Sequence, residues 1–192
     1  MKVNNIVNNK RTLNSYALEI RSASWRDLNA LIKLEKLCFS PDDAWSLIDI
    51  ISVLSTANTA RIKVEYEGQM IAFAAGERQN QSFSSGEIKK TIGWITTIAV
   101  APDFRKMGIG TKLLSAIESA LGTPIVRLSV RRSNQIAIQL YHRNGYETID
   151  VWKDYYIGHE DALIFEKKFD YKTCRGYNVD TMELLIDIGR SA

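Results

Sequence analysis

The chain has 192 residues, of which 45% are hydrophobic and 24% are charged, and its formal net charge is +3. This length and composition suit one globular domain with a sizeable core, and the small net charge gives no reason to expect direct binding of nucleic acid. The two cysteines, Cys38 and Cys174, lie far apart and the two histidines are isolated, so the sequence predicts neither a disulfide framework nor a metal site.

The N-terminal segment, residues 1–14, is polar and rich in asparagine, and we expect it to be a flexible tail. It has no apolar core of the kind found in secretory signals. No run in the chain approaches the roughly 18 apolar residues of a membrane span. The expected location is therefore cytoplasmic, without a membrane partner.

Hydrophobic periodicity predicts one domain over residues 15–169, in which strands and helices are mixed. In the first half we expect a strand at residues 16–24, helices at residues 25–38 and 45–54, and a β-hairpin with strands at residues 60–67 and 70–78. A polar loop at residues 79–86 should precede a central strand at residues 91–100. In the second half a helix should follow a glycine loop. After it we expect a strand at residues 125–130, a helix at residues 134–142, and two strands at residues 146–153 and 162–168.

The most informative segment is WITTIAVAPDFRKMGIGTKLLS, residues 94–115. A β-branched run ends at Val100, and a basic loop containing Gly108 and Gly110 then leads into a helix. Amides in the first helical turn have no intrahelical partner and attract an anion, while glycines let the backbone approach it closely. The pattern predicts a diphosphate site. It lacks the P-loop signature, and Leu113 stands where a dinucleotide-binding loop has its third glycine.

This loop closely resembles the R/Q-x-x-G-x-G/A pyrophosphate loop of the GNAT N-acetyltransferases. A second segment, NQIAIQLYHRNGY at residues 134–146, matches their N-x-x-A-x-x-L-Y-x-x-x-G-[FY] pattern. The resemblance covers about residues 16–168. It implies an α/β (α+β) fold with a twisted, mixed and mostly antiparallel sheet, helices on both faces, and central strands that separate to admit acetyl-CoA.

The same resemblance implies which residues bind the cofactor. The pantetheine would pair with the backbone near Ile98, Ala99 and Val100. The diphosphate would lie on the loop formed by Arg105, Lys106, Met107, Gly108, Ile109, Gly110 and Thr111. Asn134 could reach the cofactor or simply cap its helix. Tyr141 would protonate the departing thiolate, or else it is a structural tyrosine of the core.

A third segment, DYYIGHEDA at residues 154–162, resembles the Y-Y-x-x-G-x-E-D-A segment of protein N-terminal acetyltransferases, including the ribosomal-protein-alanine enzymes. The resemblance implies direct acetyl transfer, in a ternary complex, to the N-terminal α-amino group of a protein such as a ribosomal protein. Substrate contacts would come from Phe39, Trp45, Tyr155 and Tyr156. An α-amino group has a pKa of about 8, against about 10.4 for lysine, so it needs less help to lose its proton.

The general base is less clearly indicated. Ser129 stands where bacterial relatives have glutamate, and a serine hydroxyl is not a base at neutral pH, although it could hold a water molecule. Asp42 follows a proline, as an acidic residue does in archaeal and eukaryotic members, but it could equally be a turn residue. Glu160 is a further candidate.

Two other functions stay open. The protein could acetylate small amines or lysine side chains on the same fold. Alternatively, it could bind acyl-CoA without catalysis or depend on an auxiliary subunit, an idea supported by Ser129 and by the C-terminal extension, residues 170–192. Asp180 and Glu183 would form a capping box for a short helix expected in this extension, which could pack on its own domain or dock a partner.

Overall fold

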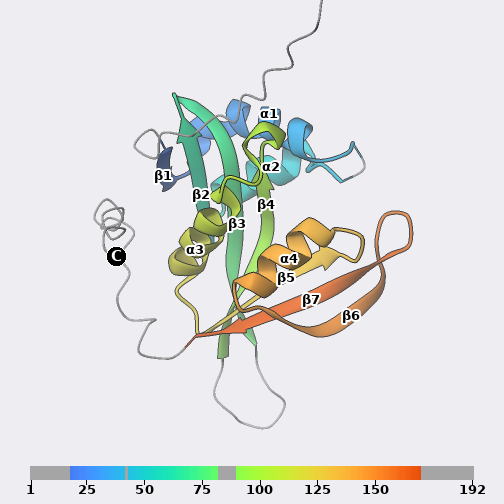
Figure 1. The fold of residues 1–192 in the computed structure, drawn as a ribbon. Coiled ribbons are helices and arrows are strands. Elements are labelled where there is room, and N and C mark those ends of the chain that lie inside the picture. The colour runs from blue at the N-terminus through green and yellow to red at the C-terminus, as the bar shows by residue number, and fades with distance from the viewer. Residues whose placement is uncertain (1–17, 42, 82–89, 170–192) are drawn as a thin grey trace, which may run out of the picture.

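A computed structural model describes residues 18–41, 43–81 and 90–169 of the chain (Figure 1). The expected tail at residues 1–14 and the expected helix within residues 170–192 lie outside the described residues. The same holds for Asp42 and for most of the expected polar loop.

Seven strands of the described residues form one sheet in the order β1-β2-β3-β4-β5-β7-β6. The strands are β1 (Leu18–Ser22), β2 (Thr59–Tyr66), β3 (Gln69–Gln81), β4 (Lys90–Val100), β5 (Ile125–Arg131), β6 (Glu147–Tyr156) and β7 (Glu160–Lys168). β4 and β5 run parallel, and the other neighbouring strands run antiparallel. The predicted mixed and mostly antiparallel sheet is thus confirmed.

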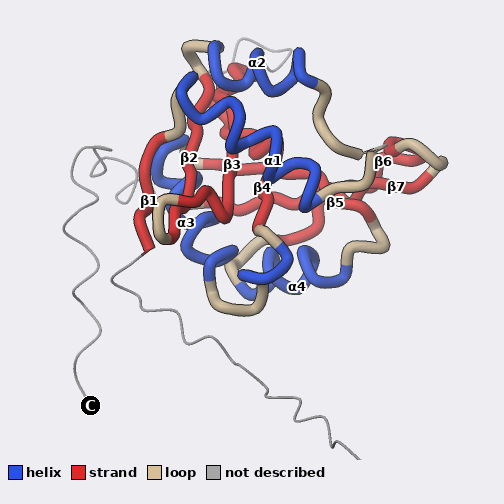
Figure 2. Tube along the Cα trace, turned by 90° about the horizontal axis from the view of Figure 1, so that it is seen from above, coloured by secondary structure: helices blue, strands red, loops and turns tan. Residues whose placement is uncertain are grey.

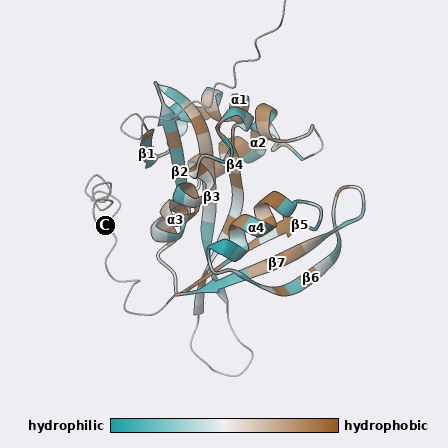
Figure 3. Cartoon of the chain, viewed as in Figure 1, coloured by the Kyte–Doolittle hydropathy of each residue, from teal (hydrophilic) through white to brown (hydrophobic). Residues whose placement is uncertain are grey.

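Four α-helices within the described residues cover the two faces of the sheet (Figure 2). They are α1 (Leu28–Cys38), α2 (Leu47–Ser55), α3 (Ile109–Leu121) and α4 (Gln135–Arg143). α1 and α2 lie on one face, where Leu31 and Leu34 pack against Phe73 of β3. α3 and α4 lie on the other face, where Leu113 and Leu114 are fully buried. Polar and apolar residues are mixed along α1 and α3 (Figure 3), and the apolar ones at helical spacing form the side that each helix buries.

The sequence-based expectation of a loop from Gln79 is wrong. β3 continues to Gln81, and its last residues pair with the start of β4. The hydroxyl of Thr91 donates to Oδ1 of Asn80 at 3.0 Å across this pair. Pairing with β4 satisfies the backbone hydrogen-bonding groups of these polar residues, so the strand extends beyond the part of the sequence with an apolar pattern.

Among the predicted element boundaries that differ from the structure, two have a clear local cause. The second helix begins at Leu47, because Ser46 and Asp49 form a capping box there. β6 runs on to Tyr156, past the predicted end at residue 153. Its pairing with β7 shifts register between Trp152 and Tyr156, so the strand bulges before it resumes.

Candidate active site

A gap between β4 and β5 lies at the centre of the candidate site. The two strands pair only from Gly93 to Ile95 on β4, although β4 continues to Val100 and β5 to Arg131. Beyond Ile95, the other edge of β4 is occupied by β3, which pairs with Ile98, Ala99 and Val100. The edge of β4 that faces the gap therefore presents backbone groups that an extended ligand could pair with.

The glycine loop opens at the end of β4, where Nε of Arg105 donates to the carbonyl oxygen of Val100 at 3.0 Å. Gly108 has a φ of 79° and precedes α3 without any side-chain cap. The amide of Lys112 makes a hydrogen bond to the oxygen of Gly108 at 3.2 Å. The three amides between them, those of Ile109, Gly110 and Thr111, belong to the first helical turn, which has no intrahelical acceptors.

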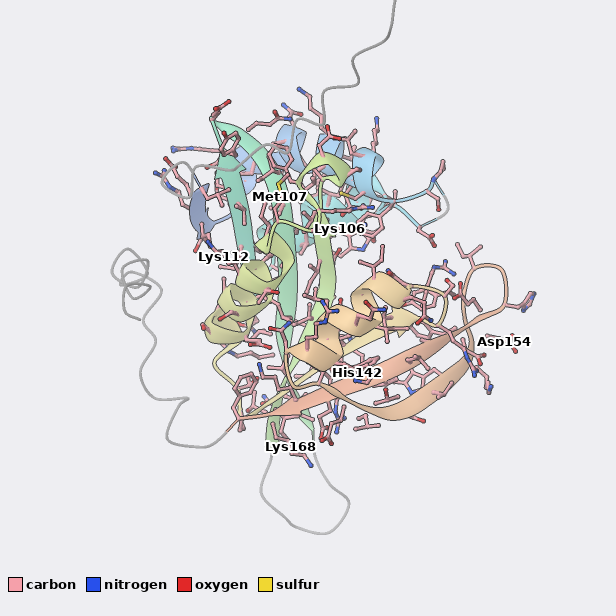
Figure 4. The ribbon with its side chains drawn as sticks, viewed as in Figure 1. Lys106, Met107, Lys112, His142, Asp154 and Lys168 are labelled. Atoms are coloured by element: carbon pink, nitrogen blue, oxygen red, sulfur yellow. The ribbon has the colours of Figure 1, made fainter. Side chains whose placement is uncertain are left out.

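This loop fits a diphosphate. The uncapped helical amides carry partial positive charge, and a Cβ at Gly108 would meet no atom within 4 Å, so the space in front of it is open. Figure 4 shows Lys106, Met107 and Lys112 around the start of α3. Ile109 is buried and anchors the loop, whereas Lys106 and Met107 are exposed. Gly110 faces α4, since a Cβ there would lie 3.4 Å from Cδ2 of Leu140.

Two residues of the second motif are placed by α4. The side chain of Asn134 accepts a hydrogen bond from the amide of Ala137 at 3.1 Å, so it caps the helix. Its predicted contact with the cofactor stays a prediction. Tyr141 is buried, with its ring 5.8 Å from those of Tyr146 and Phe165. Burial, and to a lesser extent Tyr156, raises the pKa of Tyr141 well above its usual value. Its hydroxyl therefore keeps its proton at neutral pH and can donate a hydrogen bond.

Ser129 and Tyr156 meet beside the gap. The Tyr156 hydroxyl donates to Oγ of Ser129 at 3.3 Å, and the Arg131 guanidinium lies 4.4 Å from the centre of the Tyr156 ring. Burial raises the pKa of Tyr156, and its hydrogen bond with Ser129 opposes that shift. Ser129 of β5 and Tyr156 of β6 are thus in contact. Tyr141 of α4 lies close by, because it packs on Phe165, the residue after the Ser129 partner Ile164 on β7.

The connection between α1 and α2 runs toward the β6–β7 end of the sheet (Figure 2). Asp42 lies outside the described residues. The carboxylate of Asp43 pairs with Arg131, which also pairs with Glu160 at 2.9 Å. Glu160 in turn accepts a hydrogen bond from the backbone amide of Ser133 at 2.7 Å. We call the set of Asp43, Arg131 and Glu160 the ionic tie.

The ionic tie weakens the case for Glu160 as the general base. Hydrogen bonds from Ser133, and next the pairing with Arg131, hold the pKa of Glu160 below its usual value. A carboxylate with a lowered pKa is a poorer proton acceptor, and both of its oxygens are already engaged.

The predicted substrate residues lie in two groups. Phe39 and Trp45 are partly buried against the α1–α2 core, while Tyr155 is 52% exposed beside Tyr156. The amide of Trp45 donates to Oε2 of Glu35 at 3.3 Å, which fixes the α1–α2 connection. Glu35 was not among the predicted site residues. Its signal in the sequence is an acidic residue on the apolar face of a helix, next to Leu34 and four positions after Leu31.

The comparisons with known proteins identify the family. Residues 21–146 match the Acetyltransferase (GNAT) family. The N-terminal acetyltransferase A complex catalytic subunit NAA10 of Arabidopsis thaliana is 30% identical over 158 residues, which span 80% of this chain and 79% of that protein. An N-alpha-acetyltransferase of Sulfurisphaera tokodaii is 30% identical over 152 residues, 76% of this chain and 89% of that protein.

A solved structure agrees. The ribosomal-protein-S18-alanine N-acetyltransferase of Escherichia coli superposes with a TM-score of 0.68 at 26% identity, covering 84% of this chain and 99% of that one. The chain therefore belongs to the GNAT acetyltransferase family, whose members use acetyl-CoA, and it is an N-acetyltransferase.

Two further findings concern membranes and metals. In the part of the chain that the structure describes, every helix is too short or too polar to span a bilayer. Residues 18–41, 43–81 and 90–169 also contain no group of three or more histidine, cysteine or acidic residues that could hold a metal ion.

Proposed function

We propose that this enzyme acetylates the N-terminal α-amino group of a protein, by direct transfer from acetyl-CoA in a ternary complex. The observation that carries the proposal is the convergence of Tyr141, Tyr156 and Ser129 beside the gap between β4 and β5. The names of the similar proteins support the same substrate class, and the Escherichia coli structure favours an N-terminus that begins with alanine.

The chain offers a continuous surface for the cofactor. The gap-facing edge of β4 at Ile98, Ala99 and Val100 would pair with the pantetheine, and the amides of the glycine loop would bind the diphosphate. Acetyl-CoA supplies an activated thioester when it is bound there. Direct transfer needs no covalent acyl-enzyme, and Cys38, the free cysteine of the described residues, lies outside the three segments that resemble the family.

The site residues can manage the protons of the reaction. Tyr141 is held in its protonated form and would donate that proton to the departing sulfur. At pH 7 roughly a tenth of α-amino groups are already neutral, so a strong base is unnecessary. Ser129 accepts one hydrogen bond from Tyr156 and has a second lone pair for a water molecule that takes up the amine's proton. Asp42, next to Asp43 of the ionic tie, is the other candidate for this role.

The test measures CoA release from acetyl-CoA with short peptides that begin with Ala, Ser, Thr, Met or Gly. An α-blocked lysine peptide and spermidine run beside them. We expect turnover with free α-amino termini alone, highest for Ala. Turnover confined to the lysine peptide or to spermidine would replace the proposed substrate. Cofactor binding, measured by calorimetry, with no turnover of any acceptor would point to a binding protein or to a missing auxiliary subunit.

A further inference from the structure

The connection between α1 and α2 is held at both ends by one residue, Glu35. Its backbone carbonyl oxygen accepts a hydrogen bond from the amide of Phe39 at 3.0 Å, where α1 ends. Its carboxylate oxygen Oε2 accepts a hydrogen bond from the amide of Trp45 at 3.3 Å, just before Ser46, the N-cap residue of α2. One residue of α1 therefore closes the loop formed by residues 39–45.

The loop also has internal order. The amides of Asp43 and Ala44 both donate to the carbonyl oxygen of Ser40, at 3.0 Å and 2.8 Å, and the Ser40 hydroxyl donates to Oδ2 of Asp43 at 3.0 Å. This turn presents Asp43 to Arg131 in the ionic tie. The turn is thus fixed to the sheet at its tip by the ionic tie, and to α1 at its base by Glu35.

The surroundings of Glu35 are apolar. Its side chain is 2% exposed and belongs to the side of α1 on which Leu31 and Leu34 are buried. Its Oε1 atom is buried too and has no hydrogen-bond partner in the part of the chain that the structure describes. A buried carboxyl group with an unpartnered oxygen costs folding free energy, which an apolar side chain of the same size avoids. Packing alone therefore does not explain an acidic residue here.

The other buried carboxylates of the described residues show the contrast. Glu118 is paired with Lys167 at 3.0 Å, and Glu166 is paired with Arg127 at 2.7 Å. These acids join one charged side chain to another within the sheet and its helix. Glu35 instead binds the backbone amide that leads into α2. Its partner is the end of a loop, which suits a residue that sets the position of that loop.

We propose that Glu35 is a positioning residue for the acceptor, because it fixes the connection that carries Phe39, Asp43 and Trp45. This inference rests on the proposed function, in which that connection forms one wall of the acceptor site. Glu35 is buried, so it acts through the amide of Trp45 and takes no direct part in proton transfer. Loss of its hydrogen bond should weaken acceptor binding and leave the chemical step and the cofactor site unchanged.

The experiment compares Glu35→Gln with Glu35→Met, which introduce side chains of nearly the same length. Glutamine keeps an oxygen that accepts the hydrogen bond from Trp45, whereas the thioether of methionine is a poor acceptor. The acceptor is a short peptide that begins with Ala. We expect Glu35→Met to raise KM for the peptide about tenfold, as the loss of one hydrogen bond implies, with kcat and KM for acetyl-CoA unchanged. Glu35→Gln should keep the wild-type KM for the peptide.

Two controls separate positioning from a general effect on stability. Leu54→Ala truncates a buried residue of the same core, at the end of α2 away from the connection, so its melting temperature should fall while KM stays unchanged. Glu35→Met should melt close to the wild type, because the lost hydrogen bond is offset by the removal of an unpartnered buried oxygen. Combined with Asp43→Ala, it should raise KM by less than the product of the two single effects, since both act through one loop.

Each outcome decides a different point. An unchanged KM in Glu35→Met, or an equal rise in Glu35→Gln, would overturn the inference while leaving N-terminal acetylation in place. A rise in KM that Leu54→Ala reproduces, or fully multiplicative effects in the double variant, would overturn it as well. If Glu35→Met loses its cooperative unfolding transition, Glu35→Leu takes its place with the same expected KM. No turnover of any free-amine peptide by the wild type would overturn the proposed function and this inference with it.

Discussion

The hydroxyl of Tyr156 donates a hydrogen bond to Oγ of Ser129 at 3.3 Å and so joins the β6–β7 hairpin to the strand beside the gap. The bond uses one lone pair of the serine oxygen and leaves the serine proton and the other lone pair available. Ser129 is thus oriented by a tyrosine whose own pKa is raised by burial, so that the donor stays protonated. A serine in this setting can position water although it cannot itself accept the amine's proton.

Ser129→Ala should lower kcat/KM for an N-terminal peptide by about tenfold, the effect of losing one hydrogen bond of about 1.4 kcal/mol in the transition state. Steady-state kinetics would measure it. Ser119→Ala, which changes a hydroxyl on the exposed side of α3, serves as the control and should have wild-type kinetics. Equal kinetics for the Ser129 and Ser119 variants would remove Ser129 from the proton path. A Ser129→Glu variant more active than the wild type would show that a stronger base at this position speeds the reaction.

Tyr141→Phe should lower kcat by about 100-fold and leave KM for the peptide nearly unchanged, because the proton matters only as the sulfur departs. The ring stays, so its packing on Phe165 is kept. Tyr146→Phe removes a buried hydroxyl at the end of the same motif and is the matched control for folding. A Tyr141→Phe enzyme with normal kcat would show that Tyr141 is a structural residue.

Asp43→Ala should raise KM for the peptide several-fold, with a smaller effect on kcat. The ionic tie joins the segment between α1 and α2 to β5 and β7. Its loss should therefore loosen one wall of the acceptor site. Because Asp43 and Arg131 are partly exposed, the tie should contribute only about 1 kcal/mol. Raising the ionic strength should mimic the variant in the wild type. Glu147→Ala, at an exposed position of β6, should change neither constant; an Asp43→Ala enzyme that behaves the same way would contradict the role of the tie.

Gly108→Ala should weaken acetyl-CoA binding, which calorimetry would measure as a higher Kd. The φ of 79° is costly for any residue with a Cβ, by about 1 kcal/mol, and the new methyl group would stand in the open space before the helical amides. Gly68→Ala, with a φ of 75° in the β2–β3 turn, carries the same backbone cost away from the loop. Identical cofactor affinity in the two variants would argue against the diphosphate site.

Glu35→Gln should change how stability depends on pH. Burial raises the pKa of Glu35, and the hydrogen bond from Trp45 opposes the shift. A raised pKa in the folded state means that the carboxyl favours folding at low pH and that this contribution is lost as the pH rises through the folded value. The amide cannot ionise. The free energy of unfolding of the variant should therefore increase relative to that of the wild type as the pH rises from 4 to 8. Urea denaturation would measure it, with Glu147→Gln as an exposed control; parallel pH profiles would contradict the prediction.

Local patterns made part of this site predictable from the sequence. A left-handed glycine before a helix, a capping asparagine and apolar residues at helical spacing are set by neighbours in the chain, and the structure has Gly108, Asn134 and Tyr141 in those settings. The pairing of Asp43 with Arg131 joins residues 88 positions apart. The stacking of Trp94 on Trp152 joins β4 to β6, although β5 and β7 separate them in the sheet. Such contacts follow from the twist of the whole sheet, which no local pattern encodes.

The joint between β4 and β5 consists of three residue pairs, and it holds together two parts of the sheet that carry opposite walls of the acceptor site. A ligand that filled the gap as an added strand would also stabilise the protein, since it would extend the pairing between these two parts of the sheet. The acceptor would then meet walls at a fixed spacing only after the cofactor had entered. We therefore expect ordered addition with acetyl-CoA first, because the fold places only three residue pairs between these two parts of the sheet.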